Sequence, residues 1–131
     1  MTTVFIDTES LKVHSVDGYP FLIIEPMGNL QFADYKALLS SPEIFQVITH
    51  SQLHKVYLEL TGLWTVGTEQ QEWTVGEFAT HLKAKGVTKL AIGLAAHVYP
   101  TFSLMAAAYE KQAAIPTKYF PDLDQMVEFL V

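Results

Sequence analysis

The stretch Lys55-Val-Tyr-Leu-Glu-Leu-Thr-Gly-Leu-Trp-Thr-Val-Gly-Thr68 decides the fold of this chain. Its first part, Val56 to Leu60, is typical of a β-strand, and a polar turn follows it. A helix is then indicated at Thr74-Val-Gly-Glu77, which matches a capping box. In open α/β sheets ligands bind where strands end and helices begin. The stretch therefore predicts a strand-turn-helix unit. It also indicates the edge of the sheet at which a binding site is expected.

Toward the N-terminus the sequence favours short strands. Three β-rich runs cover Val4 to Ile6, Leu11 to Val16 and Phe21 to Ile24, and the pair Asp17-Gly18 separates the second from the third. We expect an antiparallel pair there and a small β-meander overall.

Between Leu30 and His50 the apolar residues recur at helical spacing, and Ser41-Pro42-Glu43 interrupts them. Serine is a favoured N-cap, and proline is tolerated at the first helical position. The pattern therefore predicts two short helices or a kink rather than one long helix.

Repeating α/β units follow the central strand. The capped helix should end at Gly86, and the apolar run Lys89 to Ala95 is typical of a parallel strand covered on both faces. A helix from Pro100 to Ala113, a strand from Lys118 to Phe120 and a terminal helix capped by Asp122 complete the chain. We predict an α/β fold: a mixed sheet with N-terminal antiparallel strands and a parallel portion, packed by helices.

Length and composition predict one domain, residues 1–131, because the chain has 131 residues and no linker or repeat. No cysteine is present, so disulfides and thiolate chemistry are excluded. No signal peptide or long apolar run is visible, and we expect a cytoplasmic protein. The net charge of −6 disfavours nucleic acid and gives no help at an anionic membrane.

Four segments carry a resemblance to a known family. They are Leu58-Glu-Leu-Thr-Gly-Leu63, Glu72-Trp-Thr-Val-Gly-Glu-Phe78, Gly86-Val-Thr-Lys-Leu-Ala-Ile-Gly93 and the run from Tyr119 to Leu130. They resemble the STAS domains of anti-anti-sigma factors, and within them a bacterial group called SpoIIAA-like or STAS/SEC14-like. The resemblance covers most of residues 50 to 131. It implies a STAS-like sandwich and a binding or regulatory role.

In STAS domains a serine at a helix start is phosphorylated by a partner kinase. The resemblance places Gly67, Thr68 and Glu69 where the family has Asp-Ser-Ser, so the acidic residue is missing and Thr68 is the candidate phosphorylation site. A phosphate there would meet free N–H groups of a helix N-terminus. The alternative is structural, because Thr68-x-x-Gln71 can also cap a helical turn.

A ligand crevice is a second hypothesis. The connection from Trp64 to Thr74 is longer than most strand-to-helix loops, and it carries two tryptophans. His97 follows the central strand, where a ligand-contacting side chain is expected. The hypothesis places a small apolar or lipid-like ligand, or a protein partner, against Trp64, Trp73, His97, Phe102 and Met105. Core packing of the aromatic residues and a local hydrogen bond of His97 are the alternatives.

The segment from Tyr99 to Tyr109 is apolar almost all round, so its helix needs partners on both sides. We expect burial against the sheet and a neighbouring subunit in a homo-oligomer such as a homodimer. A lipid-like ligand or a membrane surface is the alternative.

Metal binding and catalysis lack a pattern. His50-x-x-x-His54 has a possible ligand spacing, but no third ligand accompanies it, and a histidine near a helix end is explained by the helix dipole. No nucleophile elbow or phosphate loop is present. We therefore expect a non-enzymatic binding module without cofactor or metal, with the phosphorylation switch at Thr68 as the alternative.

Overall fold

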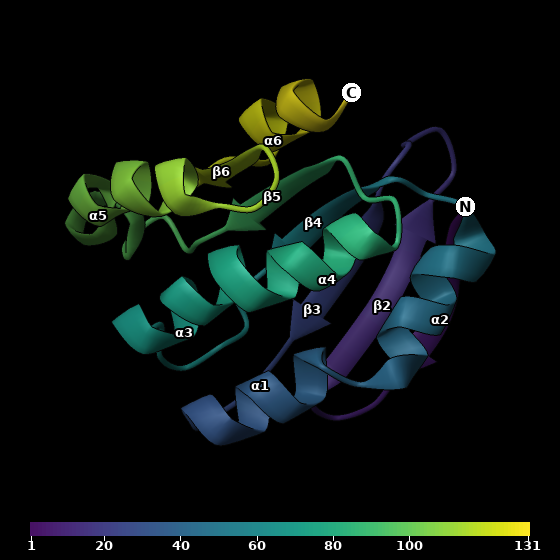
Figure 1. Ribbon diagram of the computed structural model, residues 1–131, viewed down its shortest axis with the longest axis horizontal. Coiled ribbons are helices and arrows are strands. Elements are labelled where there is room, and N and C mark those ends of the chain that lie inside the picture. Colours follow the sequence, from purple (N-terminus) through teal and green to yellow (C-terminus); the bar gives the residue numbers. More distant parts are fainter.

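The computed structural model describes all residues, 1–131, and shows one six-stranded sheet whose strands lie in chain order (Figure 1). The strands are β1 (Thr2–Asp7), β2 (Leu11–Val16), β3 (Leu22–Pro26), β4 (Lys55–Glu59), β5 (Lys89–Gly93) and β6 (Thr117–Phe120). The helices are α1 (Phe32–Leu39), α2 (Pro42–Ser51), α3 (Thr68–Trp73), η1 (Thr74–Phe78), α4 (Ala79–Ala84), α5 (Tyr99–Gln112) and α6 (Leu123–Leu130). The predicted α/β fold with a mixed sheet is confirmed.

Strands β1, β2 and β3 form the predicted antiparallel meander. Gly18 closes the turn between β2 and β3 with a φ of 92°, which favours glycine. From β3 onward each strand pairs in parallel with the next, through β6. The carboxyl ends of β3 to β6 therefore lie along one edge of the sheet.

The break between α1 and α2 has the predicted cause. Ser41 is the N-cap of α2, its side chain accepts the Glu43 N–H at 3.4 Å, and Pro42 occupies the first helical position. The end of α4 also matches its prediction, because Gly86 follows it with a φ of 90°.

The predicted cap at Thr74 is wrong. Helix α3 begins at Thr68, and α3, η1 and α4 run without a break from Thr68 to Ala84. The Thr74 hydroxyl donates to the Gln70 carbonyl at 2.7 Å and lies 2.8 Å from the Tyr35 hydroxyl. Thr74 is therefore a buried partner for Tyr35 rather than a helix start, and the long connection predicted from Trp64 to Thr74 ends at Gly67.

Two cores lie on opposite faces of the sheet. The larger contains 25 residues and joins the strands to α1, α2, the α3–α4 stretch and α5, with Leu58, Phe78 and Ile92 completely buried. The smaller lies under α6 and includes Tyr57, Ala91, Phe120, Met126 and Leu130. Strand β5 is thus buried on both faces, as predicted.

Candidate functional site

The carboxyl edge of the parallel strands carries the loops that lead into α3 and α5 (Figure 1). The loop after β4 contains Trp64, whose N–H donates to the Gly28 carbonyl at 3.1 Å. The turn after β5 contains His97, and α5 begins two residues later. This edge is where the sequence places its candidate ligand crevice.

Two of the five crevice residues are in the core. Trp73 packs edge-on to Tyr35 and stacks on Phe78, and its indole N–H donates to a Glu77 carboxylate oxygen at 2.6 Å. Phe102 stacks on Tyr109 with ring centroids 5.6 Å apart. Both rings are therefore packed against other aromatic rings of the protein, in agreement with the core-packing alternative.

The other three crevice residues are exposed. Trp64 is 73% exposed, Met105 is 38% exposed, and His97 lies on an exposed turn. The structure therefore does not gather the five side chains around one enclosed cavity. At this edge Trp64, His97 and Met105 instead form part of the exposed protein surface.

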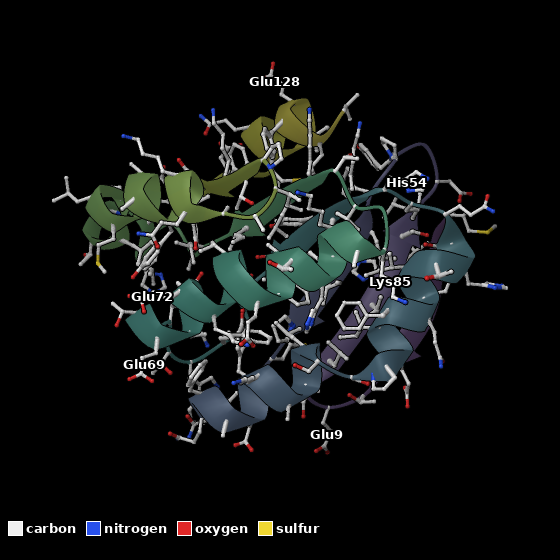
Figure 2. All side chains as sticks on the ribbon, in the orientation of Figure 1. Glu9, His54, Glu69, Glu72, Lys85 and Glu128 are labelled. Carbon is white, nitrogen blue, oxygen red and sulfur yellow. The ribbon has the colours of Figure 1, made fainter.

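Thr68 is exposed and is the first residue of α3. It lines a hollow of about 280 Å³ between the starts of α1 and α3, to which Phe32 and Gln70 also contribute. Glu69 and Glu72 project from α3 close by (Figure 2). A kinase could reach this hydroxyl, although a phosphate would sit beside carboxylates.

Helix α5 has two different faces. Phe102, Ala106 and Tyr109 are buried against the sheet, whereas Leu104 is 90% exposed and lies beside Met105 and Ala108. We call Thr101, Leu104, Met105 and Ala108 the outer stripe of α5; their spacing places them on one side of the helix. The stripe is uncharged and mainly apolar.

Sequence reasoning missed a polar cluster on the α6 face of the sheet. His14 Nε2 lies 3.8 Å from Glu25 Oε1, across β2 and β3. On β4 the Tyr57 hydroxyl donates to the Glu59 carboxylate, and a side chain at Gly93 would collide with that hydroxyl. The period-two spacing of Tyr57 and Glu59 indicates that the two side chains share one face of β4. Their neighbours on β2, β3 and β5 could not be predicted, because they depend on which strands pair and in which register.

Burial governs the protonation of this cluster. It lowers the pKa of His14, against the opposing effect of the Glu25 carboxylate, and His14 Nδ1 is buried without a hydrogen-bond partner. Burial, followed by the bond to Glu59, raises the pKa of Tyr57. The raised pKa keeps the Tyr57 hydroxyl neutral near neutral pH, so it acts as a hydrogen-bond donor to Glu59.

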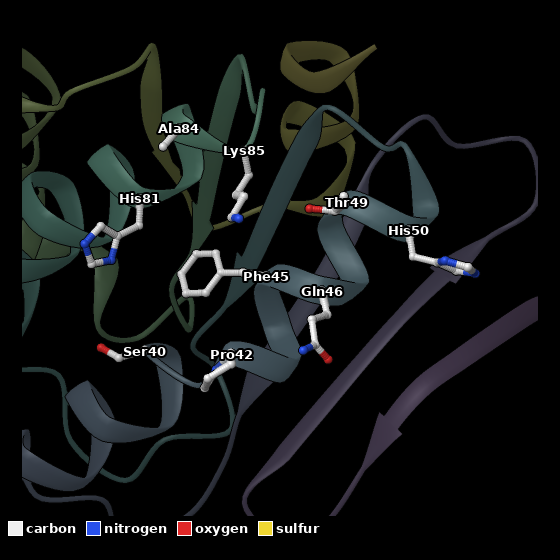
Figure 3. Close-up of a pocket in the computed structure, with 9 residues that line it drawn as sticks. All are labelled: Ser40, Pro42, Phe45, Gln46, Thr49, His50, His81, Ala84 and Lys85. Carbon is white, nitrogen blue, oxygen red and sulfur yellow. The ribbon is translucent and has the colours of Figure 1, made fainter.

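The second feature missed from the sequence is a groove of about 740 Å³ between α2 and α4 (Figure 3). Its lining includes Ser40, Phe45 and Thr49 from the α2 side and His81 and Lys85 from the α4 side. The Phe45 and His81 rings meet edge to face, 5.9 Å apart. Nothing in the sequence showed that α2 and α4 are neighbours.

Comparison with known proteins supports the architecture. A solved structure of an uncharacterized protein of the DUF3478 family from Shewanella loihica, described as having a SpoIIAA-like fold, superimposes with a TM-score of 0.53. The match covers 96% of this chain and 99% of the other.

The chain has a SpoIIAA-like fold. Only 14% of the residues are identical between the two proteins, so the likeness concerns the backbone and transfers no site residue. No protein-family model matches the sequence, and no curated protein matches it. The SpoIIAA-like fold confirms the architecture that the four sequence segments implied. None of its helices has both the length and the apolar character needed to cross a membrane.

Proposed function

We propose that this SpoIIAA-like chain is a non-catalytic binding module that acts through protein contact, and that its partner is a second copy docked along α5. The observation that supports this proposal is the outer stripe of α5, where Leu104 is 90% exposed and Met105 adjoins it. Apolar side chains that gather on one side of a surface helix favour contact with another protein.

The charge distribution favours a second copy as that partner. No charged residue occurs between Tyr99 and Tyr109, although the chain carries a net charge of −6. The first acidic residue of the helix is Glu110, and its carboxylate accepts a hydrogen bond from the Tyr119 N–H at 3.0 Å. This bond ties α5 to β6. The residues of the stripe itself therefore place no like charges opposite each other when two acidic copies meet.

The shape of the stripe suits a symmetric contact. Met105 and Leu104 lie at its centre, and Ala108 toward one end is small enough to let two helices approach closely. In a twofold contact the same residues are supplied by both copies, so one apolar stripe supplies both halves of the interface.

The surroundings of the predicted crevice favour a protein over a small apolar ligand. Trp73 and Phe102 are packed against neighbouring aromatic rings, and an enclosed ligand would have to displace them. The exposed residues Trp64 and His97 lie on the protein surface at the same edge and do not enclose a ligand.

Sedimentation velocity over a dilution series tests this function. We expect the wild-type chain to sediment as a dimer and Leu104→Gln to sediment as a monomer with an unchanged circular-dichroism spectrum. Leu123→Gln is the matched control, because Leu123 is also an exposed leucine, at 61%, on a different helix. A wild-type monomer at every concentration, or equal weakening by both substitutions, would contradict the proposal.

The phosphorylation switch is the second candidate, and the exposure of the Thr68 hydroxyl at the start of α3 favours it. Intact mass spectrometry of protein purified from its own cells tests it. A phosphate-sized addition that survives denaturation and is lost in Thr68→Ala supports the switch, whereas an unmodified mass throughout growth argues against it. Extra mass seen only under native conditions would instead point to a bound small ligand.

A further inference from the structure

We infer that the groove between α2 and α4 is a binding site for a small organic anion with a flat aromatic body. The groove is distinct from the outer stripe of α5, which supplies none of its lining residues. The inference therefore does not depend on dimer formation.

The size of the groove fits a small molecule. Its volume of about 740 Å³ lies within the ~300–1,000 Å³ typical of small-ligand sites. It is bounded by two packed helices, α2 and α4, that the larger core fixes against the sheet through Ile44, Ile48 and Leu82. Most of the lining therefore stands on helices that the core holds in place, while Ser40 and Lys85 lie in the turns directly after α1 and α4.

The middle of the groove offers an aromatic surface. The Phe45 ring projects between the helices, with its edge-to-face neighbour His81 on the α4 side (Figure 3). Phe45 also lies 6.3 Å from Phe78, ring centre to ring centre, which ties it to the core. A flat apolar body can stack or pack edge-on here, as aromatic pairs prefer.

The charge in the groove is opposite to that of the chain. Lys85 is the charged residue of its lining, and no Asp or Glu is among the lining residues, although acidic residues outnumber basic ones by 14 to 8. Neither of the ion pairs in the structure involves Lys85. Its ammonium group is available to an anionic ligand.

The positions of the polar groups specify how such a ligand would lie. Figure 3 shows the Lys85 side chain extending toward the Phe45 ring, with the Thr49 hydroxyl on the facing side of α2. The His50 ring points away from Phe45, so it is not assigned a ligand contact. The anionic group would sit between Lys85 and Thr49, and the ring would lie over Phe45 toward His81.

A titration with three probes tests the chemical class. Naphthalene-2-sulfonate combines a ring with an anion, 2-naphthol keeps the ring without the anionic group, and sulfate keeps only the anion. Followed by amide NMR shifts, the sulfonate should bind about tenfold more tightly than either fragment, the gain expected of one charge-assisted contact added to ring packing. The shifts should centre on residues 45–49 and 81–85. Equal binding of 2-naphthol, or shifts centred elsewhere, would overturn the inference.

Paired lysine substitutions test the charge. Lys85→Gln should weaken sulfonate binding about tenfold, and Lys85→Arg should restore it. Lys83→Gln is the control, because Lys83 is exposed in the last turn of α4, two residues before Lys85, and is not among the lining residues. If Lys83→Gln weakened binding as much as Lys85→Gln, net charge rather than the groove would be responsible and the inference would fail.

Discussion

At the scale of the residue, Gly93 shows how closely the sheet surface is fitted. Tyr57 on β4 crosses over Gly93 on β5 to reach the Glu59 carboxylate, and any β-carbon at Gly93 would collide with the Tyr57 ring and hydroxyl. Glycine is required there by a close approach rather than by an unusual backbone conformation.

Gly93→Ala should therefore destabilise the fold by about 1–3 kcal/mol, the usual cost of overpacking, as measured by urea denaturation. Gly76→Ala is the control, because a methyl group there meets no atom within 4 Å and alanine favours a helix. An unchanged midpoint for Gly93→Ala would show that Tyr57 leaves this position freely.

His14 gives the fold a pH dependence of known sign. Because burial lowers its pKa in the folded state below the ordinary 6.5, the unfolded chain takes up a proton first as the pH falls. The stability contributed by neutral His14 is complete above about pH 6.5 and is lost below it.

We expect His14→Gln to flatten the fall in the free energy of unfolding between pH 7 and the onset of carboxylate titration. Denaturation curves collected across that range measure it. His97→Gln, at an exposed turn, should keep the wild-type slope. A His14→Gln variant with the wild-type slope would assign the pH dependence to other groups.

At the scale of the element, α6 depends on its first turn. The Asp122 carboxylate accepts the N–H groups of Asp124 at 2.7 Å and Gln125 at 3.4 Å, and the helix then places Met126 and Leu130 on the sheet. Local sequence was enough to predict this cap, since its donors lie within three residues.

Asp122→Ala should cost about 1 kcal/mol of stability and increase hydrogen exchange selectively in α6, while Asp122→Asn should retain most of the cap. Uniform loss of protection across the sheet, or no change in α6, would contradict this account of the helix start.

The helix before β5 shows where local reading failed. Thr74-Val-Gly-Glu77 has the spacing of a capping box, yet Thr74 lies inside a helical stretch that begins at Thr68, and its hydroxyl contacts Tyr35 of α1. A contact between residues so far apart in sequence leaves no periodic signal. The π-turn at Thr74–Phe78 was likewise not predicted.

At the scale of the whole molecule, alternation, apolar runs and turn residues predicted a mixed sheet with antiparallel strands first and a parallel portion after them, and the SpoIIAA-like fold bears this out. The order of the strands within the sheet was not predicted. The candidate site was harder to predict. Aromatic type alone did not separate the core residue Trp73 from the exposed Trp64, and the α2–α4 groove exists only through packing of two distant segments. Strand ends locate an edge of the sheet, but tertiary packing determines which side chains remain free there.

The central claim is that two copies meet along α5, and the absence of cysteine allows a direct test. A single thiol introduced by Met105→Cys, at the centre of the outer stripe, should lie near its counterpart in the second copy. We predict that mild oxidation converts Met105→Cys to a disulfide-linked dimer much faster than Leu123→Cys, whose exposed thiol reports random collision. Equal rates for the two variants would contradict docking along α5.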